Sequence, residues 1–159
     1  MRSQHPLKVG LLQFYLELYD QIMPQERDGF AGFVNDIAAA FTNRGIQVAL
    51  SPVCRLNHEF TAAIKQFEEA GVDAIVTLHL AYSPSLEAID ACCRTDLPLI
   101  ILDTTMDAAF GVDVDASRIM FNHGVHGVMD FASMLCRHQR PFEIVAGHFQ
   151  KSDVIDRAA

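Results

Sequence analysis

Apolar residues fall into five short runs along the chain, and a turn signal or a stretch of helical periodicity follows each of them. The runs cover residues 7–14, 46–53, 73–78, 97–102 and 142–146. Near-continuous apolar runs of this length are typical of strands that are buried on both faces of a parallel sheet. The pattern therefore predicts five buried strands.

Between the runs, apolar residues recur every three or four positions, which is the spacing of amphipathic helices. Helices are expected over residues 30–44, 57–71, 84–94 and 122–138, with another starting near residue 151. Asn57, Ser83 and Asn122 are suitable N-caps, while Gly45 and Gly71 are suitable residues to end a helix. Loops are expected through residues 15–29 and residues 106–120.

Strands that alternate with helices through short connections are the signature of a parallel sheet covered on both faces. We predict an α/β fold, a three-layer α/β/α sandwich of the flavodoxin-like or Rossmann-like kind. Its five-stranded parallel sheet should have the strand order 2-1-3-4-5. The 159 residues are the size of one domain and contain no internal repeat or linker.

The net charge of −8 disfavours binding to nucleic acid, whose phosphates would be repelled. No apolar run reaches the roughly 18 residues that a membrane span requires. The cysteines form no CxxC pair and no zinc-like spacing, which favours reduced thiols and a cytoplasmic location. They are Cys54, Cys92, Cys93 and Cys136. We therefore expect neither a nucleic-acid nor a membrane partner.

Polar residues gather where the predicted strands end, and the carboxyl ends of parallel strands share one edge of the sheet. That edge should carry Gln13, Tyr15, His79, Asp103, Thr104, Thr105, His148 and Gln150, joined by His123 and His126 from the start of a helix. Gly124 and Gly127 accompany these two histidines, although glycine is a poor helix former. Something is therefore expected to approach the backbone closely there. The alternative is that both histidines only cap and pack.

Three other kinds of site receive less support from the sequence. His123 and His126 share a helix face, but no carboxylate stands at a suitable spacing, so no metal site is predicted for this chain alone. No GxGxxG, GxxxxGK[ST] or flavin-type loop follows the first strand. Ser83 and Ser85 lie near His79 without a nucleophile elbow. Hydroxyl, amide and imidazole groups suit a ligand with many hydroxyls, because each can donate or accept.

Four segments resemble the N-terminal domain of the L-arabinose isomerase / L-fucose isomerase family. They are residues 78–84 (LHLAYSP), 103–109 (DTTMDAA), 121–127 (FNHGVHG) and 144–150 (IVAGHFQ), in the family's order. The resemblance implies that residues 1–159 form a single N-terminal domain of a longer cytoplasmic, homo-oligomeric sugar isomerase. Family members interconvert aldoses and ketoses, and Mn²⁺ or a similar divalent metal is expected only in the full-length enzyme. The downstream metal-binding catalytic domains are absent from these residues, so this domain alone should bind no cofactor and should be inactive.

The resemblance also implies roles for individual residues. His126 matches a histidine that reaches the sugar site of a neighbouring subunit and is an auxiliary to catalysis. His123 replaces a glutamine that contacts substrate, and Thr105 stands in the position of another family glutamine. The substrate-binding residues are thus expected to be Gln13, Tyr19, His79, Thr105, His123 and His126, with His79 at the rim or behind it.

Two further functions stay open on the sequence. The chain could be a stand-alone sugar-binding or sugar-sensing module without catalysis. It could also be an oligomerisation domain, in which apolar helix residues such as Phe30 and Phe33 face a partner.

Overall fold

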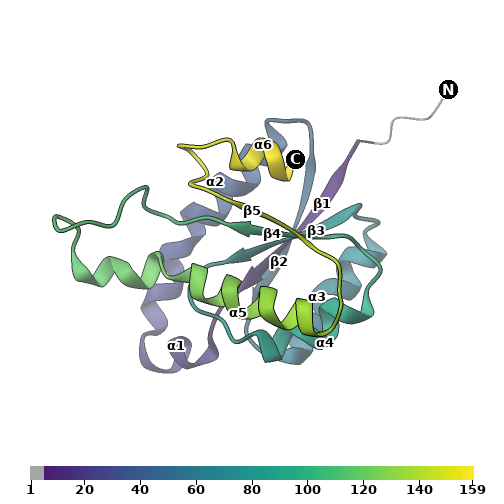
Figure 1. Ribbon diagram of the computed structural model, residues 1–159, viewed down its shortest axis with the longest axis horizontal. Helices are drawn as coiled ribbons and strands as arrows, with labels where there is room; N and C mark the ends of the chain where they lie inside the picture. The colour runs from purple at the N-terminus through teal and green to yellow at the C-terminus, as the bar shows by residue number, and fades with distance from the viewer. Residues whose placement is uncertain (1–5) are drawn as a thin grey trace.

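The computed structural model describes residues 6–159, and a five-stranded parallel sheet lies at its centre (Figure 1). The strands are β1 (Lys8–Phe14), β2 (Gln47–Cys54), β3 (Ala74–His79), β4 (Leu99–Asp103) and β5 (Glu143–Ala146). Their spatial order is β2-β1-β3-β4-β5, and every pair is parallel. The predicted fold class and strand order are confirmed.

Helices cover both faces of this sheet, which makes the three predicted layers. The helices are α1 (Glu17–Ile22), α2 (Ala31–Thr42), α3 (Asn57–Glu69), α4 (Ser85–Arg94), α5 (Gly124–Arg137) and α6 (Val154–Ala158), with 3-10 helices η1 (Pro24–Phe30) and η2 (Ala116–Phe121). One core cluster joins α2 and α6 to the sheet, and a second joins α3, α4 and α5 to its other face (Figure 1). Across residues 6–159 no helix combines the length and the apolar character that crossing a bilayer requires.

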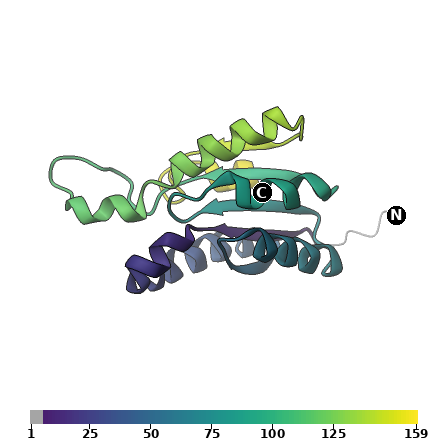
Figure 2. The ribbon, with the colours of Figure 1, turned by 90° about the horizontal axis from the view of Figure 1, so that it is seen from below.

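The segment between β4 and α5 extends away from the body of the molecule. Figure 2 shows this segment, including η2, and α1 at the same end of the sheet. That end is the carboxyl edge, because α1 follows β1 and the extended segment follows β4. It is the edge at which the sequence predicted a site.

The structure corrects several predicted element ends. Helix α1 and η1 lie where a loop was predicted, and η2 lies inside the predicted loop 106–120. Helix α1 buries none of its residues, so its sequence lacks the apolar stripe that identifies a helix. The predicted N-caps were wrong by one residue: Leu56, Pro84 and His123 take the cap positions instead of Asn57, Ser83 and Asn122.

The ends of the first two long helices agree with prediction. Gly45 and Gly71 both have positive φ, at 80° and 63°, just after α2 and α3. This left-handed conformation suits glycine and closes the helix before the next strand.

Candidate functional site

Helices α1 and α5 meet at the carboxyl edge through a hydrogen bond between side chains that are 104 residues apart. The Tyr19 hydroxyl lies 3.0 Å from Nε2 of His123, and the two rings meet edge to face with their centres 6.0 Å apart. Tyr19 is half-buried, and burial raises its pKa, so it remains a protonated phenol at neutral pH. The structure therefore brings together two of the six predicted binding residues.

The second ring nitrogen of His123 decides which way this hydrogen bond runs. Nδ1 of His123 lies 2.7 Å from the carbonyl oxygen of Ile119. A carbonyl oxygen only accepts, so Nδ1 carries the hydrogen. In the neutral ring, Nε2 is then the acceptor, and the Tyr19 hydroxyl donates to it.

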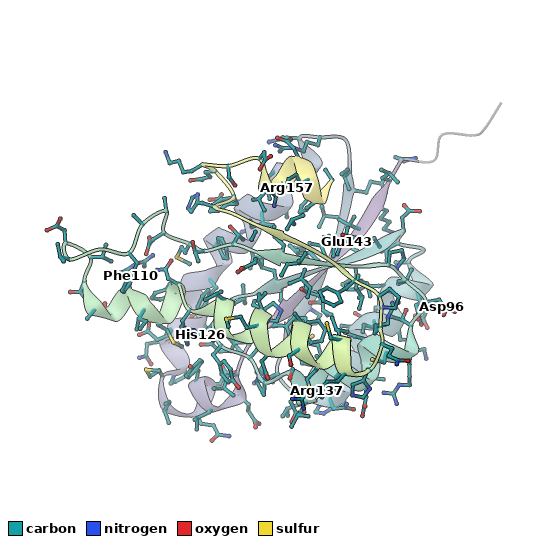
Figure 3. All side chains as sticks on the ribbon, viewed as in Figure 1. Asp96, Phe110, His126, Arg137, Glu143 and Arg157 are labelled. Atoms are coloured by element: carbon teal, nitrogen blue, oxygen red, sulfur yellow. The ribbon has the colours of Figure 1, made fainter. Side chains whose placement is uncertain are left out.

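His126 lies one turn further along α5 and is exposed (Figure 3). Its Nδ1 lies 3.2 Å from the carbonyl oxygen of His123, so by the same reasoning Nδ1 is a donor. Within residues 6–159 no protein group pairs with Nε2 of His126. In the neutral ring this nitrogen can therefore accept a hydrogen bond from a hydroxyl group outside the protein.

A cavity of about 400 Å³ opens beside the Tyr19–His123 pair. Its walls come from α1, η1, η2 and the start of α5, and its lining residues are Tyr19, Met23, Glu26, Ser117, Ile119, Met120 and His123. The volume lies within the usual range for sites that bind small molecules. Phenol, carboxylate, hydroxyl and imidazole groups share this cavity with methionine and isoleucine side chains, a mixture suited to a small molecule with both hydroxyl groups and C–H surface.

Besides His126, three more predicted residues lie outside the lining of this cavity. Gln13 donates its side-chain amide to the carbonyl of Ser51 and lines a separate cavity of about 280 Å³. Thr105 donates its hydroxyl to the carbonyl of Asp107 at 2.8 Å. His79 is buried. Sequence position placed all three at the correct edge, but their side chains do not converge with Tyr19 and His123.

His79, the last residue of β3, lies beneath the edge and is only 3% exposed. Its Nδ1 lies 2.9 Å from the Ser83 hydroxyl, its ring stacks on Phe14 with centres 4.3 Å apart, and its Nε2 has no hydrogen-bond partner. Burial lowers its pKa to about 3, so the ring is neutral. The side chain therefore lies behind the edge and not on its surface.

Two more predicted edge residues follow β4 and β5. Asp103 ends β4, and burial raises its pKa. His148 follows β5, and its Nε2 lies 3.4 Å from the carbonyl oxygen of Met106. Both residues are at the predicted edge and contact the backbone or interior rather than the cavity beside Tyr19.

A cluster that the sequence did not predict ties the extended segment to the start of α5. Arg118 donates to both carboxylate oxygens of Asp107, at 2.8 and 2.9 Å. Asn122 donates its amide to the same carboxylate at 2.7 Å, and its carbonyl oxygen accepts from the Asp107 backbone N–H at 2.8 Å. The hydrogen bonds from Arg118, and then from Asn122, hold the pKa of Asp107 below its usual range. Asn122 is thereby engaged, and His123 becomes the cap of α5 in its place.

Glu26, Ser117 and Ile119 line the cavity but were not among the predicted site residues. Glu26 lies in η1, Ser117 and Ile119 lie in η2, and both elements were predicted as loops. Apolar periodicity cannot identify short 3-10 helices, because their length gives too few turns to form a stripe. No signal in the sequence alone could have assigned these residues to the site.

A divalent metal does not fit the residues at this edge. Among the described residues, no three His, Cys, Asp or Glu side chains cluster as metal ligands would. Both ring nitrogens of His123 are already engaged, one with Ile119 and one with Tyr19.

The fold is a parallel α/β sandwich, a class of domain whose ligands commonly bind at the carboxyl edge of the sheet. The sequence model of the family described as "L-arabinose isomerase N-terminal domain" matches residues 20–159. The chain therefore belongs to this sugar isomerase family, and the predicted resemblance is confirmed for its L-arabinose isomerase part.

Two curated relatives agree with this family. An L-arabinose isomerase of Actinobacillus succinogenes is 27% identical over 115 residues, and one of Mannheimia succiniciproducens is 26% identical over the same length. In both cases the match covers 70% of this chain and 23% of the relative. The chain thus spans about a quarter of the length of these relatives.

Among solved structures, a galactofuranose binding protein is 14% identical, with a TM-score of 0.44 over 90% of this chain and 56% of that protein. The periplasmic binding protein component of the arabinose ABC transporter from Shewanella sp. ANA-3 is also 14% identical, with a TM-score of 0.41 over 89% of this chain and 55% of that protein. These scores are too low to bear on function.

Proposed function

We propose that this domain supplies part of the sugar site of an aldose–ketose isomerase of the L-arabinose isomerase family. Tyr19, His123 and His126 would contact sugar hydroxyls, and other domains or a neighbouring subunit would complete the site. The observation that carries this proposal is the Tyr19–His123 hydrogen bond, which joins α1 to α5 at the wall of the cavity.

The chemistry of these groups supports recognition rather than bond breaking. A sugar hydroxyl needs both a donor and an acceptor, and Nε2 of His126 is an acceptor open to solvent. The Tyr19 hydroxyl still has lone pairs that can accept while it donates to His123. His126 is therefore proposed as an auxiliary that orients the sugar. The proposal keeps three further residues as substrate-binding on the family resemblance alone: Gln13, Thr105 and His79.

The proton transfer and the divalent metal, Mn²⁺ or a similar ion, are assigned to residues outside this domain. The proposal also includes a homo-oligomer, because the family resemblance implies that His126 reaches the sugar of a neighbouring subunit. A cytoplasmic location is supported by the four cysteines, all of which have free thiols.

The direct test is His126→Ala in the intact enzyme to which this domain is proposed to belong. Loss of one hydrogen bond to the sugar should lower kcat/KM for L-arabinose about tenfold. The melting temperature should not change, because the side chain is exposed. His138→Ala is the matched control, since His138 is exposed at the opposite end of α5. Full activity in His126→Ala would contradict the proposed role of this edge.

A calorimetric titration separates this proposal from the stand-alone module. The 159-residue chain should not isomerise L-arabinose and should not bind it saturably at millimolar concentration. Saturable binding without turnover would favour a sugar-binding module instead.

A further inference from the structure

Helix α5 begins in direct contact with the end of β3, and two buried glycines make this contact possible. A Cβ atom at Gly124 would lie 2.3 Å from the carbonyl oxygen of His79. A Cβ atom at Gly127 would lie 2.8 Å from Oγ of Ser83 and 2.9 Å from Nδ1 of His79. Neither position has room for a methyl group. The sequence predicted that something approaches the backbone closely at these glycines. The groups that do so are His79, at the end of β3, and Ser83.

The surface under these glycines cannot easily move aside. His79 and Ser83 are both buried and are joined by a 2.9 Å hydrogen bond. The His79 ring is held further by stacking on Phe14 and by contact with Phe131, whose ring centre is 5.9 Å away. We call His79 and Ser83 together the β3 seat.

The position of α5 on the β3 seat also fixes the two candidate sugar-contacting histidines. His123 directly precedes Gly124, and His126 directly precedes Gly127. Relief of the 2.3 Å contact at Gly124 would require α5 to rise by about 1 Å. A shift of this size along the 3.0 Å hydrogen bond between Tyr19 and His123 would break it, because such bonds end at about 3.5 Å.

We infer that Gly124 and Gly127 are positioning residues, which set the depth of α5 on the β3 seat. This depth holds His123 against Tyr19, and it holds His126 at the edge of the sheet. The geometric part of this inference depends only on the β3 seat. Its consequence for sugar binding rests on the proposed function.

If Gly124 and Gly127 affected only the intrinsic stability of the helix, replacing them by alanine would stabilise α5 and leave His123 in place. Glycine destabilises a helix relative to alanine, so replacement by alanine stabilises a helix wherever space is open. Gly32 in α2 is such a place, because nothing lies within 4 Å of its Cβ position. Gly32→Ala is therefore the matched control for Gly124→Ala and Gly127→Ala.

The test is the ¹⁵N imidazole spectrum of the 159-residue chain. In the unchanged protein and in Gly32→Ala, His123 should show the Nδ1–H tautomer with Nε2 accepting a hydrogen bond. Gly124→Ala and Gly127→Ala should lose this signature and resemble Tyr19→Phe, in which the pair is absent by design. A Gly127→Ala protein that folds and keeps the signature would overturn the inference.

A second variant keeps the test decisive if Gly124→Ala fails to fold. Ser83→Ala removes the atom nearest to the added methyl group in Gly127→Ala. The double variant should recover part of the His123 signature. A double-variant spectrum identical to that of Gly127→Ala alone would show that the β3 seat is not what positions His123.

Kinetics of the intact enzyme test the proposed function separately. Gly127→Ala should raise the KM for L-arabinose roughly tenfold, the result of one lost hydrogen bond. Loss of the His123 signature with an unchanged KM would support the inference that Gly127 positions His123. The same result would contradict the proposed sugar site.

Discussion

His79 and His126 lie at the same edge of the sheet and have opposite environments. His79 is covered by Phe14 and Phe131, and its pKa is lowered to about 3. His126 is exposed, and its Nε2 faces solvent. The same residue type is therefore a core residue in one case and an available hydrogen-bond acceptor in the other. The aromatic rings beside His79 make this difference, and a position at the shared edge does not.

The largest effect is expected on the buried side of this comparison. Phe14 is fully buried and contacts the rings of Phe60, Phe131 and His79. Phe14→Ala should lower the free energy of unfolding by about 3–5 kcal/mol, because it leaves a cavity in the core. Urea denaturation measures this loss. Phe110, which is 51% exposed on the extended segment (Figure 3), is the control. Phe110→Ala should change stability by no more than about 0.5 kcal/mol.

The next effect is a pH dependence that should come from His79. The unfolded state takes up a proton below the ordinary histidine pKa of about 6.5, while the folded state does so only near pH 3. Stability is therefore complete above pH 6.5 and falls as the pH decreases between these two values. From pH 7 to pH 5 the loss should be about 2 kcal/mol.

His79→Gln provides the control for this pH dependence, since glutamine does not titrate and can still bond to Ser83. Urea denaturation at pH 7 and pH 5 should show this part of the slope disappearing in the variant. An equal slope in both proteins would mean that His79 takes up its proton in the folded state.

The smallest effect is expected at the open side of the edge. Tyr19→Phe removes the hydrogen bond to His123 and should lower the free energy of unfolding by about 1 kcal/mol. Tyr82 is the control, because its hydroxyl has no hydrogen-bond partner within residues 6–159, and Tyr82→Phe should leave stability unchanged. Equal melting temperatures for Tyr19→Phe and the unchanged chain would show that the hydrogen bond contributes nothing to stability.

The strand order and the layers could be predicted because buried strands and amphipathic helices leave strong patterns. The apolar run at residues 7–14 and the stripe of α2 both became core elements. The shift of the α5 cap from Asn122 to His123 could not be predicted, because the Asn122 amide bonds to Asp107, 15 residues away. A partner at that distance leaves no local signal.

The candidate site was predicted in part, for reasons that the structure makes clear. His123 and His126 lie at the edge that the strand order predicted, and Tyr19, which only the family resemblance suggested, meets His123 there. Gln13 and Thr105 did not join them, since each side chain bonds to a nearby backbone carbonyl. Side-chain direction of this kind depends on local hydrogen bonds, which a pattern of apolar residues does not encode.

The separation of Tyr19 and His123 by 104 residues has a consequence for how the protein folds. Bringing such distant residues together carries a loop-closure entropy that local helices do not, and contacts of high sequence separation slow folding. Between the two residues lie β2, β3 and β4, so the contact between α1 and α5 closes a loop that contains three strands of the sheet. During synthesis, the cavity wall can form only after residue 123 has left the ribosome, so the candidate site is a late product of folding.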